Sequence, residues 1–203
     1  MSTMFPKKPE AVPLYYAARL GFCDLAKHLI AEHPEHVNAR GGEDVTMLHA
    51  AARAGHVDIL SLLLEHGADM SSPGYFDGTP LHGSSLGGEV NAGQFLLDRG
   101  ADINARDRGA FTPLFRAVAN EDVETVRMLL ERGARTDGPH DNAYDGAVLH
   151  RGVRAGNIQV LQLLLEHGAD ANARDKSGKT PSQLTEQQEI QELLSKYGTK
   201  SGE

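Results

Sequence analysis

The chain has 203 residues, a formal net charge of −8 and a single cysteine, Cys23. An acidic balance argues against nucleic-acid binding, for which a clustered basic face is expected, and one cysteine excludes an intramolecular disulfide. The N-terminus has no apolar signal region, and no run reaches the roughly 18 apolar residues of a membrane helix. We therefore expect an intracellular, cytoplasmic protein with neither nucleic acid nor membrane as a partner.

Six copies of one sequence pattern organise the chain. The clearest copy, TMLHAAARAGHVDILSLLLEHGADM, runs from Thr46 to Met70. Successive copies begin 33 to 35 residues apart, at Val12, Thr46, Thr79, Thr112, Ala147 and Thr180. One repeat of this length cannot bury its apolar face alone, so neighbouring repeats must stack. The periodicity therefore predicts a helical solenoid over residues 12–198, between a flexible lead-in (residues 1–11) and a flexible tail (residues 199–203).

Each repeat is predicted to contain two helices. The repeats occupy about residues 12–45, 46–78, 79–111, 112–146, 147–179 and, as a shorter polar cap, 180–198. In the second repeat, Thr46 is a favourable N-cap, and Gly55 is placed to end the first helix in the left-handed conformation. A second helix from Asp58 to Glu65 follows and ends at Gly67. We expect the same pair of helices in the other repeats.

Two repeats depart from this pattern in ways that affect stability. Repeat three carries Gly83 inside its first helix, where an interior glycine costs about 1 kcal/mol relative to alanine. This helix is therefore predicted to be the weakest of its kind. Repeat four has Asn120 and Glu121 where the other repeats have one residue followed by glycine. Because asparagine tolerates the left-handed conformation, we expect Asn120 to form the turn with a shifted register.

The linked elements TPLH, GHVDILSLLL and HGAD, at this spacing, resemble the ankyrin repeat over roughly Val12 to Gly198. The resemblance implies an all-α fold, a solenoid of about six helix-turn-helix repeats with β-hairpin-like fingers between them. It also implies a non-catalytic protein that binds other macromolecules, chiefly proteins, through a concave face made by the fingers and the first helices. The first repeat, PLYYAARLGF followed by AEHPEHVNARGG, looks like repeats in the C-terminal sensor arrays of large NACHT-type receptors.

Ten histidines raise the question of a metal or acid–base site. His49, His82 and His150 share one slot of the repeat, and the resemblance implies that they bond to neighbouring backbone. No histidine pair shows the spacing of a zinc motif with cysteine or carboxylate partners, and no serine–histidine combination has a nucleophile elbow. We therefore expect no enzyme activity, no catalytic residue, no metal and no cofactor.

Aspartates and asparagines recur after the second helix, as Asp69, Asp102 and Asp170 with Asn38, Asn104 and Asn172. Their side chains can hydrogen-bond within the turn. The resemblance also allows hydroxylation of the asparagines by a 2-oxoglutarate oxygenase, and the sequence leaves both interpretations open.

Positions that the scaffold does not dictate are the candidates for binding. One predicted set lies on the first helices. It consists of Leu86 and a row of five arginines, which we call the arginine row: Arg19, Arg53, Arg116, Arg151 and Arg154. Guanidinium groups in a row suit the carboxylates or phosphates of a partner. The alternative is that these arginines are solvated residues that favour helices.

A second predicted set lies at the finger tips. Its members are Tyr75, Phe76, Asp77, Arg108, Phe111, Asn142 and Tyr144. Aromatic residues and arginine on turns resemble the composition of interface hot spots. Packing between fingers would explain Phe111 and Tyr144 equally well.

These residues predict a protein-protein interaction scaffold that binds a protein or peptide with acidic and apolar features over repeats two to five. The protein is expected to be a monomer. Two alternatives stay open: a sensor fragment of a larger multidomain receptor, and a self-associating structural array that uses its apolar N-terminal repeat.

Overall fold

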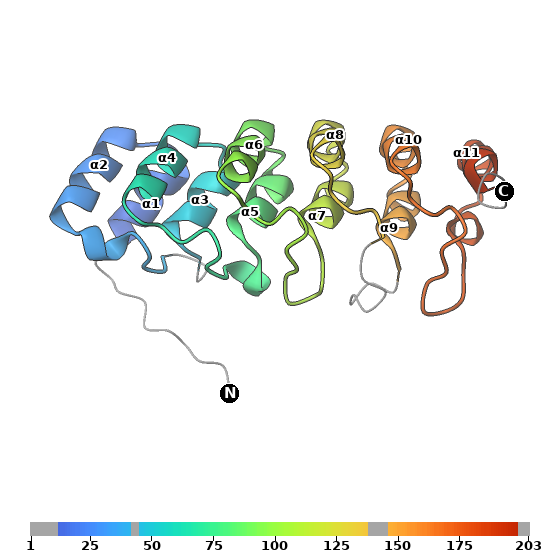
Figure 1. Ribbon diagram of the computed structural model, residues 1–203, viewed down its shortest axis with the longest axis horizontal. Coiled ribbons are helices and arrows are strands. Elements are labelled where there is room, and N and C mark those ends of the chain that lie inside the picture. The colour runs from blue at the N-terminus through green and yellow to red at the C-terminus, as the bar shows by residue number, and fades with distance from the viewer. Residues whose placement is uncertain (1–11, 42–44, 138–145, 199–203) are drawn as a thin grey trace. The chain divides into compact units, whose positions relative to one another are not determined.

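The computed structural model describes residues 12–41, 45–137 and 146–198 (Figure 1). Within these ranges the chain forms eleven α-helices, several 3₁₀ turns and one isolated antiparallel bridge, between Arg40 and Thr46. The all-α prediction is confirmed. The predicted lead-in and tail, and the finger residues Asn142 and Tyr144, lie outside the described residues. None of the described helices has the length and apolar character needed to cross a membrane.

The chain divides into two compact units, Met1–Asp102 and Ile103–Glu203. The first unit contains three helix pairs: α1 (Val12–Leu20) with α2 (Cys23–Glu32), α3 (Met47–Arg53) with α4 (Val57–Glu65), and α5 (Pro80–Gly87) with α6 (Val90–Asp98). The first helices contact one another in the order α1, α3, α5, and the second helices in the order α2, α4, α6. Two 3₁₀ turns, η2 (Pro34–His36) and η4 (Tyr75–Asp77), lie in the segments that connect these pairs.

The second unit repeats this arrangement. It contains α7 (Pro113–Ala119) with α8 (Val123–Glu131), α9 (Val148–Ala155) with α10 (Ile158–Glu166), and η5 (Pro181–Leu184) with α11 (Gln188–Gly198). Helix α9 contacts α7 and η5, and α10 contacts α8 and α11. The last pair thus has a short 3₁₀ turn where the other repeats have a full first helix.

Small residues on the first helices allow neighbouring repeats to approach closely. Ala51 and Ala52 of α3 are fully buried, and Ala50 is almost so. A Cβ atom added to Gly87 of α5 would lie 2.3 Å from the carbonyl oxygen of Arg53, so α5 packs directly on the end of α3. Leucines of the second helices, such as Leu60 and Leu63, fill the layer behind, and each buried side chain contributes about 1.5–3 kcal/mol.

Side-chain hydrogen bonds join each repeat to the next. His49 accepts from the hydroxyl of Thr46 at Nδ1 (2.8 Å) and donates from Nε2 to the carbonyl of Gly78 in the following finger (2.9 Å). In the second unit His150 Nε2 bonds the carbonyl of Lys179 in the same way (3.1 Å). The backbone-bonding role that the resemblance implies is therefore observed at both positions.

The asparagines also act between repeats. Asn38 donates to the carbonyl of Gly67 (2.8 Å) and accepts from the backbone N–H of Asp69 (2.9 Å). Asn104 accepts from the backbone N–H of Arg135 (3.0 Å). These bonds of Asn38 and Asn104 join one repeat to the next. The predicted bonding within the turn is made by the aspartates: Asp69 accepts from the backbone N–H of Ser71 (2.8 Å), and Asp170 accepts from that of Asn172 (2.8 Å).

Repeat four forms its turn without the expected shift. Asn120 is right-handed (φ −90°), and Glu121 takes the left-handed conformation (φ +59°) that Gly55 adopts in repeat two. The N–H of Asp122 bonds the carbonyl of Ala117, which matches the bond from His56 to Ala51. The prediction for Asn120 is wrong, because the fixed path of the chain between helices imposes the register and overrides local preference.

Left-handed residues other than glycine define a stability prediction. Ala110 (φ +59°) stands where Gly178 (φ +77°) stands in the finger before η5. Replacing either residue by glycine relieves about 1–2 kcal/mol of left-handed strain in the folded state. This gain exceeds the cost of about 0.4–1 kcal/mol that comes from the added conformational freedom of the unfolded chain. We therefore expect Ala110→Gly and Glu121→Gly each to raise the free energy of unfolding by roughly 0.5–1 kcal/mol, measured by urea unfolding followed by circular dichroism.

The matched control is Gly178→Ala, because nothing lies within 4 Å of a Cβ atom added there. Gly178→Ala therefore tests the effect of the left-handed backbone conformation without a steric clash, and it should lower the free energy of unfolding. A stability loss in both glycine variants would contradict the strain argument.

Candidate partner-binding surface

The finger before α5 presents two aromatic side chains to solvent. Tyr75 is 61% exposed and Phe76 is 50% exposed. Their rings meet edge to face, with centroids 4.2 Å apart and an interplanar angle of 62°. The finger is closed by backbone bonds from Gly74 to Gly78 (2.7 Å) and from Gly78 to Tyr75 (3.2 Å). The aromatic pair is thus displayed on an ordered turn.

The same turn holds two consecutive left-handed residues, Phe76 (φ +53°, ψ +34°) and Asp77 (φ +59°). Each such residue costs on the order of 1–2 kcal/mol, and a bulky residue there is an outlier of the kind that gathers at functional sites. Exposure adds to this cost, since burial of one aromatic ring would gain about 1.5–3 kcal/mol. The left-handed conformation of Asp77 is shared by Ala110 and Gly178 at the equivalent positions of two other fingers, whereas that of Phe76 is not shared by Gly109 or Ser177.

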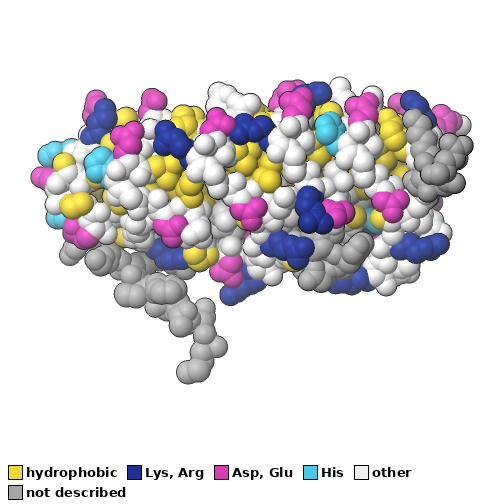
Figure 2. Space-filling model, viewed as in Figure 1, with side chains coloured by type: hydrophobic (Ala, Val, Ile, Leu, Met, Phe, Trp, Pro, Cys, Tyr) yellow, Lys and Arg dark blue, Asp and Glu magenta, His cyan; other side chains and the backbone are white. Residues whose placement is uncertain are grey.

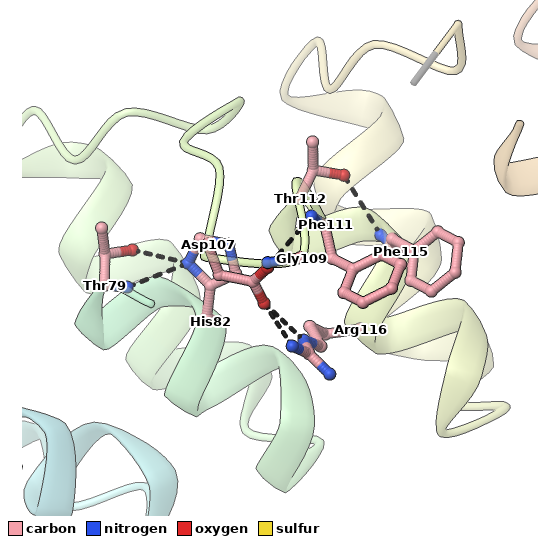
Figure 3. Close-up of polar contacts among 8 residues, drawn as sticks. All are labelled: Thr79, His82, Asp107, Gly109, Phe111, Thr112, Phe115 and Arg116. Carbon is pink, nitrogen blue, oxygen red and sulfur yellow. Dashed lines mark hydrogen bonds and ion pairs between the residues drawn. The ribbon is translucent and has the colours of Figure 1, made fainter. Parts of the chain in front are cut away.

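The finger after α6 has the same length but a different construction (Figure 3). The carboxylate of Asp107 accepts the backbone N–H groups of Gly109 (2.8 Å) and Phe111 (3.0 Å). Its second oxygen accepts from Arg116, through Nε (3.0 Å) and Nη2. The Asp107 side chain is 2% exposed and that of Arg116 is 26% exposed. This finger is therefore fastened to helix α7 by a charge-assisted bond.

The aromatic residue of this finger is also engaged. The Phe111 ring stacks on Phe115, with centroids 4.3 Å apart, and the Arg116 guanidinium lies 4.9 Å from the Phe111 centroid. The structure thus brings together Phe111 and Arg116, two predicted binding residues, in a packing role. Arg108 of the same finger is exposed.

The finger of Tyr75 and Phe76 lacks both partners of the Asp107–Arg116 pair. The equivalent positions are Gly74 and Gly83. A Cβ atom at Gly74 would lie 2.4 Å from His49 Nε2, so no carboxylate fits there. Without that anchor, the finger of Tyr75 and Phe76 adopts its own turn and leaves the rings exposed.

The predicted arginine row occupies the last turns of the first helices. In the first unit, Arg19 of α1 and Arg53 of α3 are exposed, and Leu86 of α5 is 39% exposed. Since α1 contacts α3 and α3 contacts α5, these residues belong to neighbouring helix ends. A bond from His56 Nε2 to the Arg19 carbonyl (3.2 Å) fixes the first of these ends.

In the second unit, Arg154 is exposed in the last turn of α9. Arg151 donates from Nη2 to the carbonyl of Ala119 at the end of α7 (3.0 Å) and is only partly exposed. Arg151 thus joins two repeats, whereas the exposed position of Arg154 suits contact with a partner.

Burial controls the protonation of the histidine that joins repeats two and three. Loss of hydration lowers the pKa of His49 to about 4, and the charges of Arg40 and His82 act in the same direction. The neutral ring has one N–H for the Gly78 carbonyl and one lone pair for the Thr46 hydroxyl. The hydrogen bonds of His49 therefore require the uncharged form.

The lowered pKa of His49 makes the stability of the protein depend on pH. Between pH 6.5 and about 4, His49 binds a proton in the unfolded chain but not in the folded one, so stability falls as pH is lowered. The slope from this residue is at most about 1.4 kcal/mol per pH unit. We expect His49→Gln to flatten the dependence of unfolding free energy on pH between pH 7 and 5.5, measured by urea unfolding at each pH.

The control for this experiment is His28→Gln, because His28 is an exposed histidine of the same unit. It should keep the wild-type slope. An unchanged slope in His49→Gln would refute the assignment.

One cluster of potential metal ligands was not predicted from the sequence. His33, Glu35 and His36 place one potential ligand atom each within 4.8 Å of one another. The available signal was the sequence HPEH, which stands where repeats two and five read HGAD.

Comparison with known proteins agrees with this architecture. The family described as "Ankyrin repeats (3 copies)" matches residues 14–107 and 107–175. The chain belongs to the ankyrin repeat family. Two solved ankyrin repeat domains share the fold: that of Bcl-3, with a TM-score of 0.79 and 27% identity over 94% of this chain and 86% of that one, and one from Acinetobacter baumannii AYE, with a TM-score of 0.78 and 29% identity over 92% and 97%.

Curated relatives match in shorter segments. Ankyrin repeat and SOCS box protein 11 of Danio rerio is 49% identical over 51 residues, which cover 25% of this chain and 17% of that protein. The NF-kappa-B inhibitor cactus of Drosophila melanogaster is 52% identical over 40 residues, 19% of this chain and 8% of that protein. The chain thus spans less than a fifth of the length of each of these relatives.

Proposed function

We propose that this protein is a non-catalytic binding module whose protein partner docks on the finger and first-helix surface, the concave face of ankyrin repeats. Ankyrin repeats are generally protein-protein interaction modules. The exposed Tyr75–Phe76 pair carries the proposal, because both rings are exposed and Phe76 takes a left-handed conformation that Gly109 and Ser177 do not take at the equivalent position of other fingers. The name of one relative, NF-kappa-B inhibitor, describes action on another protein and supports a protein partner here.

The exposed groups define the chemistry of the partner. Tyr75, Phe76 and Leu86 offer apolar contacts, and Arg19, Arg53 and Arg154 offer guanidinium groups for carboxylates. The remaining members of the proposed set are Asp77, Arg108, Phe111, Arg116, Asn142, Tyr144 and Arg151. On the face drawn in Figure 2, Lys and Arg side chains are interspersed with Asp and Glu, without an extended basic field. These features favour a partner segment with apolar and acidic side chains.

Site-specific crosslinking tests this proposal. A photoreactive benzoyl-phenylalanine at position 76 should crosslink a specific protein in an extract of the native cell, identified by mass spectrometry. For that partner, Tyr75→Ser with Phe76→Ser should reduce affinity more than about tenfold, because hot-spot residues contribute 2 kcal/mol or more. Arg53→Glu with Arg154→Glu should also weaken binding and reduce its salt dependence.

The matched control places the same photoreactive group at Gln94, an exposed position on α6. It should not capture the same protein. Equal crosslinking from both positions, or unchanged affinity in variants that keep the wild-type circular dichroism spectrum, would refute recognition by this surface.

Self-association is a second candidate, because exposed apolar side chains gather on the first helix pair. They are Val12 (37%), Tyr16 (50%), Leu20 (55%), Phe22 (55%) and Leu25 (44%). Exposed apolar groups of this extent mark interaction sites. The proposed occupant is a second copy, whose identical face would match it across a twofold axis.

Sedimentation equilibrium over a range of concentrations tests self-association. The wild-type mass should rise toward that of a dimer, and Leu20→Glu with Phe22→Glu should stay monomeric. Leu86→Glu, which changes an exposed leucine on α5, should dimerise like the wild type. A wild-type monomer at the highest concentration would exclude this candidate.

A further inference from the structure

The turn that follows α2 differs from the equivalent turns of repeats two and five. Those repeats read HGAD, and Gly67 (φ +83°) and Gly168 (φ +84°) end the second helix in the left-handed conformation. Repeat one has Pro34 at this position, and proline holds φ near −65°. The chain therefore continues into the 3₁₀ turn η2.

The 3₁₀ turn brings its two histidines together. Because a 3₁₀ helix has three residues per turn, side chains three positions apart lie over one another. The rings of His33 and His36 are stacked, with centroids 4.9 Å apart and planes inclined by 26°. The carboxylate of Glu35 approaches both: Oε1 lies 3.4 Å from His33 Nδ1 and 3.6 Å from His36 Nε2.

The two oxygen–nitrogen separations are close to those between ligands of one metal ion, and the three potential ligand atoms all lie within 4.8 Å of one another. The two separations are longer than the roughly 2.7–3.2 Å of good hydrogen bonds. Ligands bound at about 2.0–2.1 Å in a tetrahedral zinc site lie about 3.3–3.4 Å from one another. Two imidazoles and one carboxylate form a ligand set that zinc and similar divalent ions accept.

The surroundings suit an open site of fixed geometry. His36 is only 3% exposed, which holds its ring in place, whereas the side chains of His33 and Glu35 are about half exposed, at 51% and 55%. An ion can therefore reach the cluster from solvent.

We propose that His33, Glu35 and His36 bind one divalent transition-metal ion of the zinc type, with water in the remaining position. The site lies apart from the residues proposed for partner recognition and does not depend on that function. The ion would cross-link the end of α2 to the turn that leads into repeat two.

Calorimetric titration of the full chain, stripped with EDTA and supplied with zinc chloride, tests the proposal. Wild type should bind one equivalent saturably, and its Tm should rise with zinc concentration. His33→Ala and Glu35→Gln change exposed side chains and should each weaken binding more than about tenfold, since even outer-shell changes at metal sites cost 10–100-fold.

Two variants serve as controls. His28→Ala removes a histidine that contacts a single carboxylate, Glu32 (3.4 Å), and His66→Ala changes the position equivalent to His33 in repeat two. Both should bind zinc like the wild type. Absence of saturable binding at one equivalent, or wild-type affinity in both His33→Ala and Glu35→Gln, would overturn the assignment.

Discussion

The stability of each unit depends on contacts between neighbouring repeats, because no helix pair is thick enough to bury its own apolar surface. Fully buried leucines such as Leu48 and Leu60 are covered only when another pair stacks on them. The hydrogen bond from His49 to the carbonyl of Gly78 holds neighbouring repeats together at the finger. The bond from Asn38 to the carbonyl of Gly67 holds them together at the C-terminal ends of the second helices. The residues that meet these requirements recur in several repeats, as His49 and His150 and as Asn38 and Asn104. The positions proposed for recognition lie elsewhere, at the finger tips and exposed helix ends.

The recurrent part of the fold could be predicted from the sequence for this reason. The first helix of repeat two was expected after Thr46, and α3 begins at Met47; the second was expected to end at Glu65, where α4 ends. Local propensity failed where the stack dictates backbone conformation. Glu121 is left-handed beside an asparagine that would tolerate that conformation better, because the hydrogen bonds around the turn leave a single register.

The candidate site was less predictable, because exposure depends on contacts that composition does not reveal. Phe76 and Phe111 carry the same signal, an aromatic residue on a finger. Asp107 and Arg116, nine residues apart, fasten the finger of Phe111, whereas Gly74 and Gly83 take their places near Phe76 and leave the rings exposed. Aligning the repeats shows the loss of both partners. The left-handed conformation of Phe76, which Gly109 does not share, is visible only in three dimensions.

Two departures from the repeat pattern differ in the free energy that they cost and in the chemical groups that they bring together. Glu121 changes one position, strains one residue and gathers no chemical groups around it. The HPEH turn replaces three of four positions and buries an imidazole, His36, in the slot where Asp69 and Asp170 are exposed. Burial of a polar ring costs hydration, and repeats two and five show that the scaffold manages without it. The proposed metal site uses this burial, because it holds one ligand in position before the ion arrives.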